Sequence, residues 1–453
     1  MATYLNAPSG RFGTPTNAKK YTISTWIKPA VEGNDTNNFF NYNYGSGKQA
    51  ISIQIRNNDQ TLRINQYVPG TDTYDIRTNR VFRDPSAWYH IVIKYDSTQS
   101  TASDRVKLYV NGENQTSLAA SNYPAQDADS FIADTPNNNK GINIGNQWDG
   151  SGNASANSYF LGYMAQFIYT DGYAYDASTF GSTNANGIWV PNSSPSVTYG
   201  TNGFKLDFAG TGASADASGF GADSSGNGNH FTANSLGTNP STTDTCQNNF
   251  MTLNPLAILE GGNSPNNIPD YSKGNTVATA SNGTTRFAMG TFATTMPYYF
   301  EVKVLSTSST DSSQRVGVID EGAFHKTATY SSVYKADGVI TATGESDDSG
   351  NQSLTANSVV GVAVDLATNN NIKYYHNGTL QATMAVGTSY RSLATTPFAR
   401  LVDATQSFSF NFGNPSYTIS SGNADANGYG NFEYAVPSGY YALCTKNLAA
   451  YGG

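Results

Sequence analysis

Charged side chains are scarce in this sequence of 453 residues. Asp, Glu, Lys and Arg make up 13% of it, about half of the roughly 25% usual for soluble domains. The 25 Lys and Arg against 33 Asp and Glu give a net charge of −8 at pH 7. No basic cluster matches a phosphate backbone or an anionic lipid surface. Nucleic acid and membrane insertion are therefore not expected.

Cysteine and histidine are also rare. The two cysteines, Cys246 and Cys444, are expected to stay free thiols, although the sequence alone leaves their pairing open. The four histidines lie in separate segments, at His90, His230, His325 and His376. They lack the close spacing of a zinc site, and no Gly-x-Ser-x-Gly nucleophile turn is present. We expect neither structural zinc nor a hydrolytic triad.

Long hydrophobic runs are missing as well. The N-terminal MATYLNAPSG has neither the basic nor the apolar region of a signal peptide. No stretch approaches the roughly 18 apolar residues of a membrane span. We expect the protein to be made in a cytoplasm without a secretory signal.

Aromatic and neutral polar residues are abundant instead. The 44 Gly, 30 Tyr and 22 Phe stand among many Asn, Ser and Thr. Hydroxyl and amide side chains suit exposed strand faces, where helices would use Lys and Glu. Because β-sandwiches commonly take roughly 200–250 residues, the length predicts two of them.

The first half shows strand patterns and a tight turn. Apolar residues alternate in YTISTWI (residues 21–27), which predicts a half-buried strand. WYHIVIKYD (88–96) and DRVKLYVNGE (104–113) predict two further strands, and Asn111-Gly112 supplies the two positive-φ residues of a type I′ hairpin. The last strand of this half is predicted at FKLDF, residues 204–208.

The second half repeats these signals. NIKYYHNGTL (residues 371–380) contains a second hairpin turn, Asn377-Gly378. In FSFNFGNP the alternation predicts one core-facing row of rings, formed by Phe408, Phe410 and Phe412. Both halves fit an antiparallel two-sheet jelly roll.

A polar segment separates the halves. Residues 211–249 are rich in Gly, Ser and Asn and have few large apolar side chains. We predict an all-β chain of two tandem jelly-roll β-sandwiches, residues 1–210 and 250–453, joined by this ordered connector.

The motifs resemble two known domain families. The first half is similar to laminin-G/pentraxin-like, concanavalin-type domains through YTISTWIKP, WYHIVIKYD, VKLYVNG and GYMAQFIYTDGYAYDASTF. The second half resembles a SPRY domain through YYFEVKV, RVGVID, VVGVAVDL, NIKYYHNGTL, PFARL and FSFNFG, in that order. DSSGNGNHF, NNFMTLNPL and GYYALCTKNL are similar to the join and tail of tailed-bacteriophage structural proteins that carry this domain pair.

This resemblance implies a non-enzymatic virion protein, assembled in the host cytoplasm and then extracellular. It would be a tail-fibre or receptor-binding component, or a head decoration, and it would contact other virion proteins and a host glycan or protein. A homo-oligomer, with a trimer as our guess, is expected for such a component. The alternatives are a secreted carbohydrate-binding or adhesion protein and a polysaccharide-degrading enzyme on the same scaffold.

The carboxylates do not predict catalysis. Glycoside hydrolases need two facing acids, whereas Glu301 is a lone strand carboxylate that we expect to face outward or lie at an edge. Glu345, Asp347 and Asp348 lie among Gly and Ser, which predicts a solvated loop. We assign no catalytic residue.

Calcium is the more plausible metal, because relatives of the first half often hold it in loops. Asp223, Ser225, Asn227 and Gly228 mimic the start of an EF-hand loop, but position 12 is Asn234 instead of Glu. We expect an Asx-turn-rich segment that would bind calcium weakly if at all, and we predict no cofactor. The loop pairs Glu32 with Asp35 and Asp127 with Asp129 have equally low specificity.

Aromatic residues divide into core and candidate contact residues. Trp26 and Trp88 lie in strand patterns and are expected to pack inside. Sugar faces stack on exposed rings, and Trp148 is the best candidate for a sugar or partner contact. The other loop aromatics considered are Tyr42, Tyr44 and Tyr175.

Overall fold

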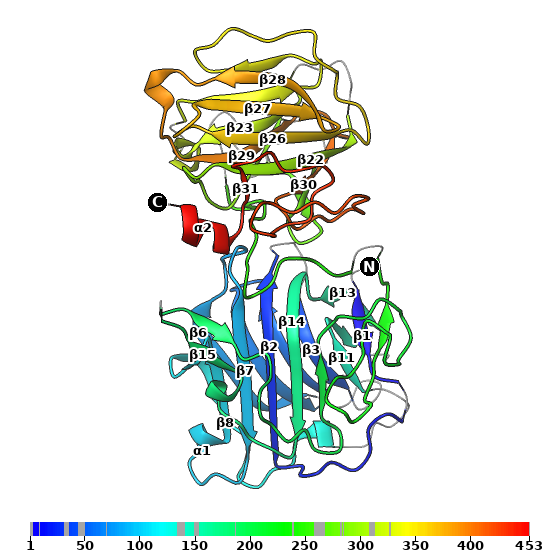
Figure 1. The fold of residues 1–453 in the computed structure, drawn as a ribbon. Helices are drawn as coiled ribbons and strands as arrows, with labels where there is room; N and C mark the ends of the chain where they lie inside the picture. The colour runs from blue at the N-terminus through cyan, green and yellow to red at the C-terminus, as the bar shows by residue number, and fades with distance from the viewer. Residues whose placement is uncertain are drawn as a thin grey trace. The chain divides into compact units, whose positions relative to one another are not determined.

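The computed structural model folds into two compact units, Met1–Ser241 and Thr242–Gly453 (Figure 1). It describes residues 3–8, 10–30, 36–43, 50–68, 70–133, 141–148, 154–185, 187–237, 240–257, 268–280, 283, 285–307, 313–325 and 328–452. Within these ranges, no helix has both the length and the hydropathy needed to span a bilayer.

The first unit is built from antiparallel strands. They are β1 (Tyr4–Asn6), β2 (Lys20–Pro29), β3 (Thr36–Asn43), β4 (Ala50–Arg56), β5 (Thr61–Val68), β6 (Thr71–Val81), β7 (Tyr89–Asp96), β8 (Val106–Val110), β9 (Glu113–Asn114), β10 (Leu118–Asn122), β11 (Ile142–Ile144), β14 (Gly162–Asp171), β17 (Phe204–Leu206) and β18 (Thr232–Asn234). Two small hairpins are β12 (Asn146–Trp148) with β13 (Ala154–Tyr159), and β15 (Gly181–Thr183) with β16 (Trp189–Pro191). Short helical turns are α1 (Ala102–Arg105), η1 (Phe131–Ala133) and η3 (Ala177–Thr179).

These strands form the two sheets of a sandwich. Among the described residues, one sheet runs β10-β6-β5-β4-β3-β11-β1-β18 and the other β17-β14-β2-β7-β8-β9. The core combines side chains from both sheets, including Ile53 and Phe40 from the first and Ile23, Ile93 and Phe167 from the second. The alternating apolar residues of each strand therefore bury one face of its sheet against the other sheet.

The outer face of β2 is also covered, contrary to the predicted half-buried strand. Residues 21–27 are buried at every position. The chain after β14 returns over this face, where Thr22 Oγ1 donates to the Tyr173 carbonyl at 2.9 Å and accepts from the Tyr175 N–H at 2.8 Å. A second apolar cluster, including Ile168, Val92 and Phe180, lies in this layer.

The polar segment is divided between the units, so the structure draws the boundary differently from the sequence prediction. Residues 211–241 belong to the first unit, and β18 pairs with β1 at the edge of its sheet. Phe231 is fully buried with its ring centroid 4.7 Å from that of Phe204. A few large apolar residues thus hold this segment against the first sandwich, although its composition is that of a flexible linker.

The second unit is a further sandwich. Its strands are β19 (Asp270–Ser272), β20 (Val277–Thr279), β21 (Arg286–Met289), β22 (Tyr298–Ser306), β23 (Arg315–Asp320), β24 (Ser331–Lys335), β25 (Ile340–Ala342), β26 (Val359–Asp365), β27 (Asn371–His376), β28 (Thr379–Ala385), β29 (Thr395–Leu401), β30 (Ser407–Asn411) and β31 (Tyr441–Ala442). In its described part, one sheet runs β19-β20-β30-β22-β26-β27-β28, with β31 parallel to β22, and the other runs β21-β29-β23-β24-β25. The helical turns are η5 (Glu321–His325), η6 (Thr388–Tyr390) and α2 (Thr445–Tyr451).

The fold confirms the predicted all-β class, with two antiparallel β-sandwiches and little helix. Phe408, Phe410 and Phe412 are all fully buried in one core, as predicted. Both hairpin turns are confirmed as well, because φ is 50° at Asn111 and 83° at Gly112, and 48° at Asn377 and 77° at Gly378.

Candidate functional site

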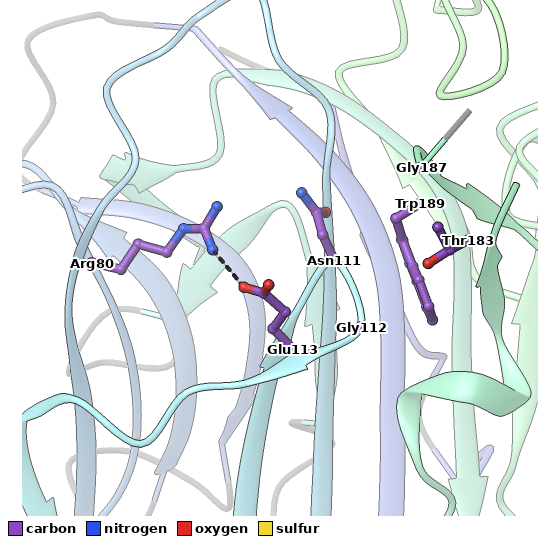
Figure 2. A pocket seen from close by; sticks show the side chains of 7 residues that line it. All are labelled: Arg80, Asn111, Gly112, Glu113, Thr183, Gly187 and Trp189. Atoms are coloured by element: carbon purple, nitrogen blue, oxygen red, sulfur yellow. Dashed lines mark ion pairs between the residues drawn. The ribbon is translucent and has the colours of Figure 1, made fainter. Parts of the chain in front are cut away.

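A pocket of about 430 Å³ lies in the first unit beside the Asn111-Gly112 turn. Its lining residues come from β6, from the β8–β9 turn and from the β15–β16 hairpin; they are Arg80, Asn111, Gly112, Glu113, Thr183, Gly187 and Trp189. Figure 2 shows Arg80, Glu113 and Asn111 on one side and the Trp189 ring on the other. Three segments that are far apart in the sequence therefore shape one pocket.

The Trp189 ring is anchored by a buried histidine. Its Nε1–H donates to His90 Nδ1 at 2.9 Å, and the two rings stack with centroids 6.0 Å apart. His90 also stacks on Trp26, with ring centroids 4.7 Å apart. Since His90 is 1% exposed, the half-buried Trp189 rests on a fixed support.

The histidine is held in its neutral form. Burial lowers the pKa of His90 to about 3. Because Nδ1 accepts from the indole, we assign the ring proton to Nε2, which lies 2.9 Å from Ser24 Oγ. An uncharged imidazole is therefore available as an acceptor for Trp189 at neutral pH.

The Asn111-Gly112 turn, which packs against the Trp189 ring, is fixed by the same histidine. The backbone N–H of His90 donates to Asn111 Oδ1 at 2.8 Å. The next residue, Gly112, packs so closely on Trp189 that a Cβ atom would lie 2.5 Å from Cζ3 of the ring. His90 thus holds both the turn and the aromatic wall, and glycine allows their close approach.

Two opposite charges line the pocket. Arg80 Nη1 lies 3.8 Å from Glu113 Oε2, with side chains 38% and 79% exposed (Figure 2). Such an exposed pair contributes at most about 1 kcal/mol. Both groups can therefore exchange their mutual contact for contacts with a ligand.

The chain was compared with known proteins. Residues 2–169 match the family described as the concanavalin A-like lectin/glucanases superfamily, Laminin_G_3, and residues 297–415 match the SPRY domain family. The chain combines a laminin-G-like domain with a SPRY domain. This confirms the predicted domain pair. The Trp189 hairpin lies outside the matched residues of the laminin-G-like domain.

Solved structures show likenesses at low identity. Mouse laminin alpha1 chain, domains LG4-5, is 8% identical with a TM-score of 0.28, over 98% of this chain and 84% of that chain. The SPRY domain of human HERC1 is 11% identical with a TM-score of 0.26, over 35% and 96%. The CBM40 domain of the Ruminococcus gnavus IT-sialidase is 14% identical with a TM-score of 0.26, over 39% and 95%. No curated protein matches the chain.

The prediction that Glu301 faces outward or lies at an edge is wrong. In the SPRY domain Glu301 is fully buried, and its carboxylate accepts from the backbone N–H groups of Glu433 at 2.9 Å and Tyr434 at 2.8 Å. Asn411 Nδ2 and the Tyr299 hydroxyl also donate to it, at 3.1 and 3.2 Å. Burial raises the pKa of Glu301, while these donors oppose the shift. The carboxylate anchors the segment that covers β22.

The EF-hand-like loop uses its oxygens for its own turns. Asp223 Oδ1 accepts from the Ser225 and Lys205 N–H groups, both at 2.9 Å. Asp223 Oδ2 accepts from the Ser225 hydroxyl at 2.9 Å and the Asn229 N–H at 2.8 Å. This is the predicted Asx-turn-rich structure. Within the described ranges, no group of three or more His, Cys, Asp or Glu side chains is placed to hold a metal ion.

Other sequence candidates fall into three groups. Trp26, Trp88 and Tyr42 are buried, which confirms the two tryptophans as core residues. Exposed carboxylates are Glu345, Asp347 and Asp348, in the predicted solvated loop, together with Asp127 and Asp129. Outside the described residues or side chains lie Glu32, Asp35, Tyr44 and Trp148.

Of the remaining candidates, Tyr175 and His230 make hydrogen bonds within the fold, and the two cysteines form no disulfide. The Tyr175 hydroxyl accepts from the Thr198 N–H at 2.9 Å, and His230 Nδ1 accepts from the Asp223 N–H at 2.9 Å. Cys246 and Cys444 are free thiols, as predicted.

Sequence reasoning missed Trp189 and Arg80. Trp189 is 99 positions from His90 in the sequence, and GIWVP shows no alternation that would place it on a sheet face. The one usable signal was that Trp189 is one of four tryptophans and lies beside Gly and Pro, where a loop or an edge strand is expected.

Proposed function

We propose that this protein is a non-enzymatic virion structural protein, either a tail-fibre or receptor-binding component or a head decoration, that adheres to a host surface or to other virion proteins. It would be assembled in the host cytoplasm and carried outside on the particle. The domain pair supports a binding role, and the similarity of residues 223–231, 248–256 and 439–448 to phage structural proteins supports the virion.

The Trp189 pocket is the observation that carries the binding role. A ring supported by His90 lines the same pocket as Arg80 and Glu113, which have only a weak mutual contact. Such a site binds without needing a nucleophile or a paired acid, because shape, an apolar face and a few polar groups suffice for recognition.

Weak individual sites fit an adhesion protein on a particle. Many copies linked to one particle convert later binding events into intramolecular ones, which raises avidity by about 10²–10⁴. We propose a homo-oligomer, with a trimer as the first state to test by light scattering of the full chain.

The test of this function is the location of the protein and its effect on adsorption. Antibodies against the purified full chain should label purified particles, and the recombinant protein should adhere to host cells and compete with particles for adsorption. Detection only as a free secreted protein would support the adhesion alternative and contradict the virion assignment. Release of reducing sugar by the pure protein would favour the polysaccharide-degrading alternative and contradict a non-enzymatic role.

A further inference from the structure

We propose that Arg315 and Arg400, on the outer face of the sheet β21-β29-β23-β24-β25, form a binding site for one phosphate group. The site lies in the second unit, so this inference goes beyond the proposed function, which rests on the Trp189 pocket. Three observations carry it: the two arginines are cross-strand neighbours, neither has an acidic partner, and a third cation lies in the same row.

The register of the sheet places the two arginines side by side. Arg315 in β23 is directly opposite Arg400 in β29. Residues directly opposite one another in an antiparallel pair lie on the same face, with Cβ atoms about 4.5–5.5 Å apart. The adjacent residues Val316 and Ala399 belong to the core between the two sheets. Both arginines therefore project from the other, outer face.

The same cross-strand row continues on both sides of the pair. Lys335 in β24 is opposite Arg315, and Phe287 in β21 is opposite Arg400. Lys335 Nζ lies 3.7 Å from Asp347 Oδ2, but the Asp347 side chain is 60% exposed, so this ion pair is weak. The two arginines thus lie between a third cation and a half-buried aromatic ring.

No acidic group compensates the two guanidinium groups. Within the described part of the chain, neither Arg315 nor Arg400 forms an ion pair or a hydrogen bond, and the Nε atom of each is buried without a partner. Burial and the charge of Arg400 both lower the pKa of Arg315. Arginine nevertheless stays protonated in proteins, so two half-buried positive charges repel one another across the strands.

The chemistry of this pair selects a phosphate group. Each guanidinium presents its N–H donors in a planar fork that matches two oxygens of one phosphate. A phosphate monoester carries a charge of about −1.5 to −2 at pH 7 and three acceptor oxygens. It can therefore accept from both arginines and neutralise both. A carboxylate or a sulfate ester has a single charge and would leave one arginine without a counter-ion.

The overall charge limits the ligand to a single phosphate group. The net charge of −8 repels a long polyanion such as a nucleic acid, whereas one phosphate meets only the local positive row. Free inorganic phosphate and the phosphomonoester of a larger molecule carry the same group, so the experiment has to separate these two sources.

The experiment measures ligand binding by the full chain in a phosphate-free buffer at constant ionic strength. Inorganic phosphate, glucose 6-phosphate, glucose 6-sulfate and glucuronate are each titrated by calorimetry. We expect the phosphate ligands to bind roughly tenfold or more tightly than the singly charged sulfate ester and glucuronate. Tighter binding of glucose 6-phosphate than of inorganic phosphate would identify a phosphomonoester as the ligand, and the reverse order would identify the free ion.

Phosphate should also stabilise the second unit selectively. A ligand that binds only the folded state raises the unfolding temperature, and at about 100 times its Kd we expect a rise of about 5 °C or more in the transition of the second unit, measured by scanning calorimetry. All four tryptophans lie in the first unit, so the transition followed by tryptophan fluorescence should not move.

Substitutions separate a binding role from a structural one. Arg315→Gln and Arg400→Gln should each weaken phosphate binding by roughly tenfold or more. Without ligand, both variants should be at least as stable as the wild type, because the repulsion between the arginines is removed. Arg400→Lys keeps the charge but loses the planar fork, and should weaken binding by about threefold. Arg391→Gln removes the same charge from an exposed site of the SPRY domain and is the matched control, which should bind phosphate as the wild type does.

Several results would overturn the phosphate assignment. These are no phosphate binding by the wild type, equally tight binding of glucuronate, and wild-type phosphate binding by the folded Arg315→Gln and Arg400→Gln variants. A loss of stability in both variants without ligand would give the arginines a structural role and overturn it as well. None of these results depends on whether the protein is found on particles, so the proposed function is tested separately.

Discussion

The backbone N–H of Val359 donates a 2.8 Å hydrogen bond to the side-chain Oδ1 of Asn377. In the laminin-G-like domain, Asn111 Oδ1 accepts an equivalent hydrogen bond from the backbone N–H of His90. Each asparagine is followed by a glycine whose Cβ position would lie 2.5 Å from an aromatic ring, that of Tyr434 or Trp189. The two halves share this turn structure. The asparagine side chain bonds the hairpin to the neighbouring strand, and the absence of a Cβ atom at glycine allows an aromatic ring to pack closely on the turn.

The turn bond predicts the effect of Asn377→Gly. Glycine tolerates the φ of 48°, so the substitution removes the side-chain bond without backbone strain. We expect a loss of about 1 kcal/mol and a drop of about 2–4 °C in the melting temperature of the SPRY domain, measured by calorimetry. Asn357→Gly is the control, since Asn357 is exposed with φ of 72°. Equal effects of the two substitutions would show that the Asn377 bond contributes nothing.

The close approach of Gly112 to Trp189 predicts a cost for Gly112→Ala. Both this residue and the control Gly70 have positive φ, but a Cβ atom at Gly70 meets nothing within 4 Å. Gly112→Ala should therefore destabilise the laminin-G-like domain by about 1–3 kcal/mol more than Gly70→Ala. All four tryptophans lie in the first unit, which contains this domain, so urea unfolding followed by tryptophan fluorescence measures the stability of that unit selectively. An equal loss in both variants would contradict the packing described.

The buried carboxylate of Glu301 predicts a large effect of Glu301→Gln. The amide would place an N–H₂ group against one of the N–H donors of Glu433 and Tyr434. We expect a loss of about 2–4 kcal/mol in the SPRY domain. Faster hydrogen exchange at residues 431–434 should accompany this loss, with no change in the tryptophan-reported transition. Glu345→Gln, at an exposed site, should be neutral, and a neutral Glu301→Gln would contradict the anchoring role.

The lowered pKa of His90 predicts acid sensitivity of the laminin-G-like domain. Burial lowers the pKa of His90 from 6.5 to about 3. Between pH 6.5 and pH 3, His90 therefore binds a proton in the unfolded chain but not in the folded domain. The contribution of neutral His90 to the free energy of unfolding is therefore fully present above pH 6.5 and decreases as the pH falls toward 3. Between pH 7 and 5 the wild type should lose about 2 kcal/mol more than His90→Gln does. Urea titrations by tryptophan fluorescence measure this difference, and identical pH profiles would refute it.

Local patterns predicted which face of a strand is apolar, but not what covers its other face. Phe300 and Val302 alternate with Glu301, so the sequence places Glu301 away from the core between the sheets. It is buried because Glu433 and Tyr434, more than 130 positions later, cover that side. The outer face of β2 is likewise covered by the later residues 173–180, and no local alternation in the sequence predicts those contacts.

The turns and the phenylalanine row were predictable because their causes are local. Asn-Gly requires positive φ at both positions, and alternation places Phe408, Phe410 and Phe412 on one face. The pocket depends instead on contacts between three distant segments, so Trp189 and Arg80 could not be paired from sequence alone. The extent of the first domain was missed for a similar reason, since Phe231 in a polar stretch packs on Phe204.

The most direct test of the account is to incubate the purified full chain with isolated host surface polysaccharide and to measure bound protein and new reducing ends in the same sample. Adhesion without catalysis predicts saturable binding, weakened by Trp189→Phe, with reducing ends that stay at the level of the protein-free control. Reducing ends that increase with time and protein concentration, or an absence of binding, would contradict it.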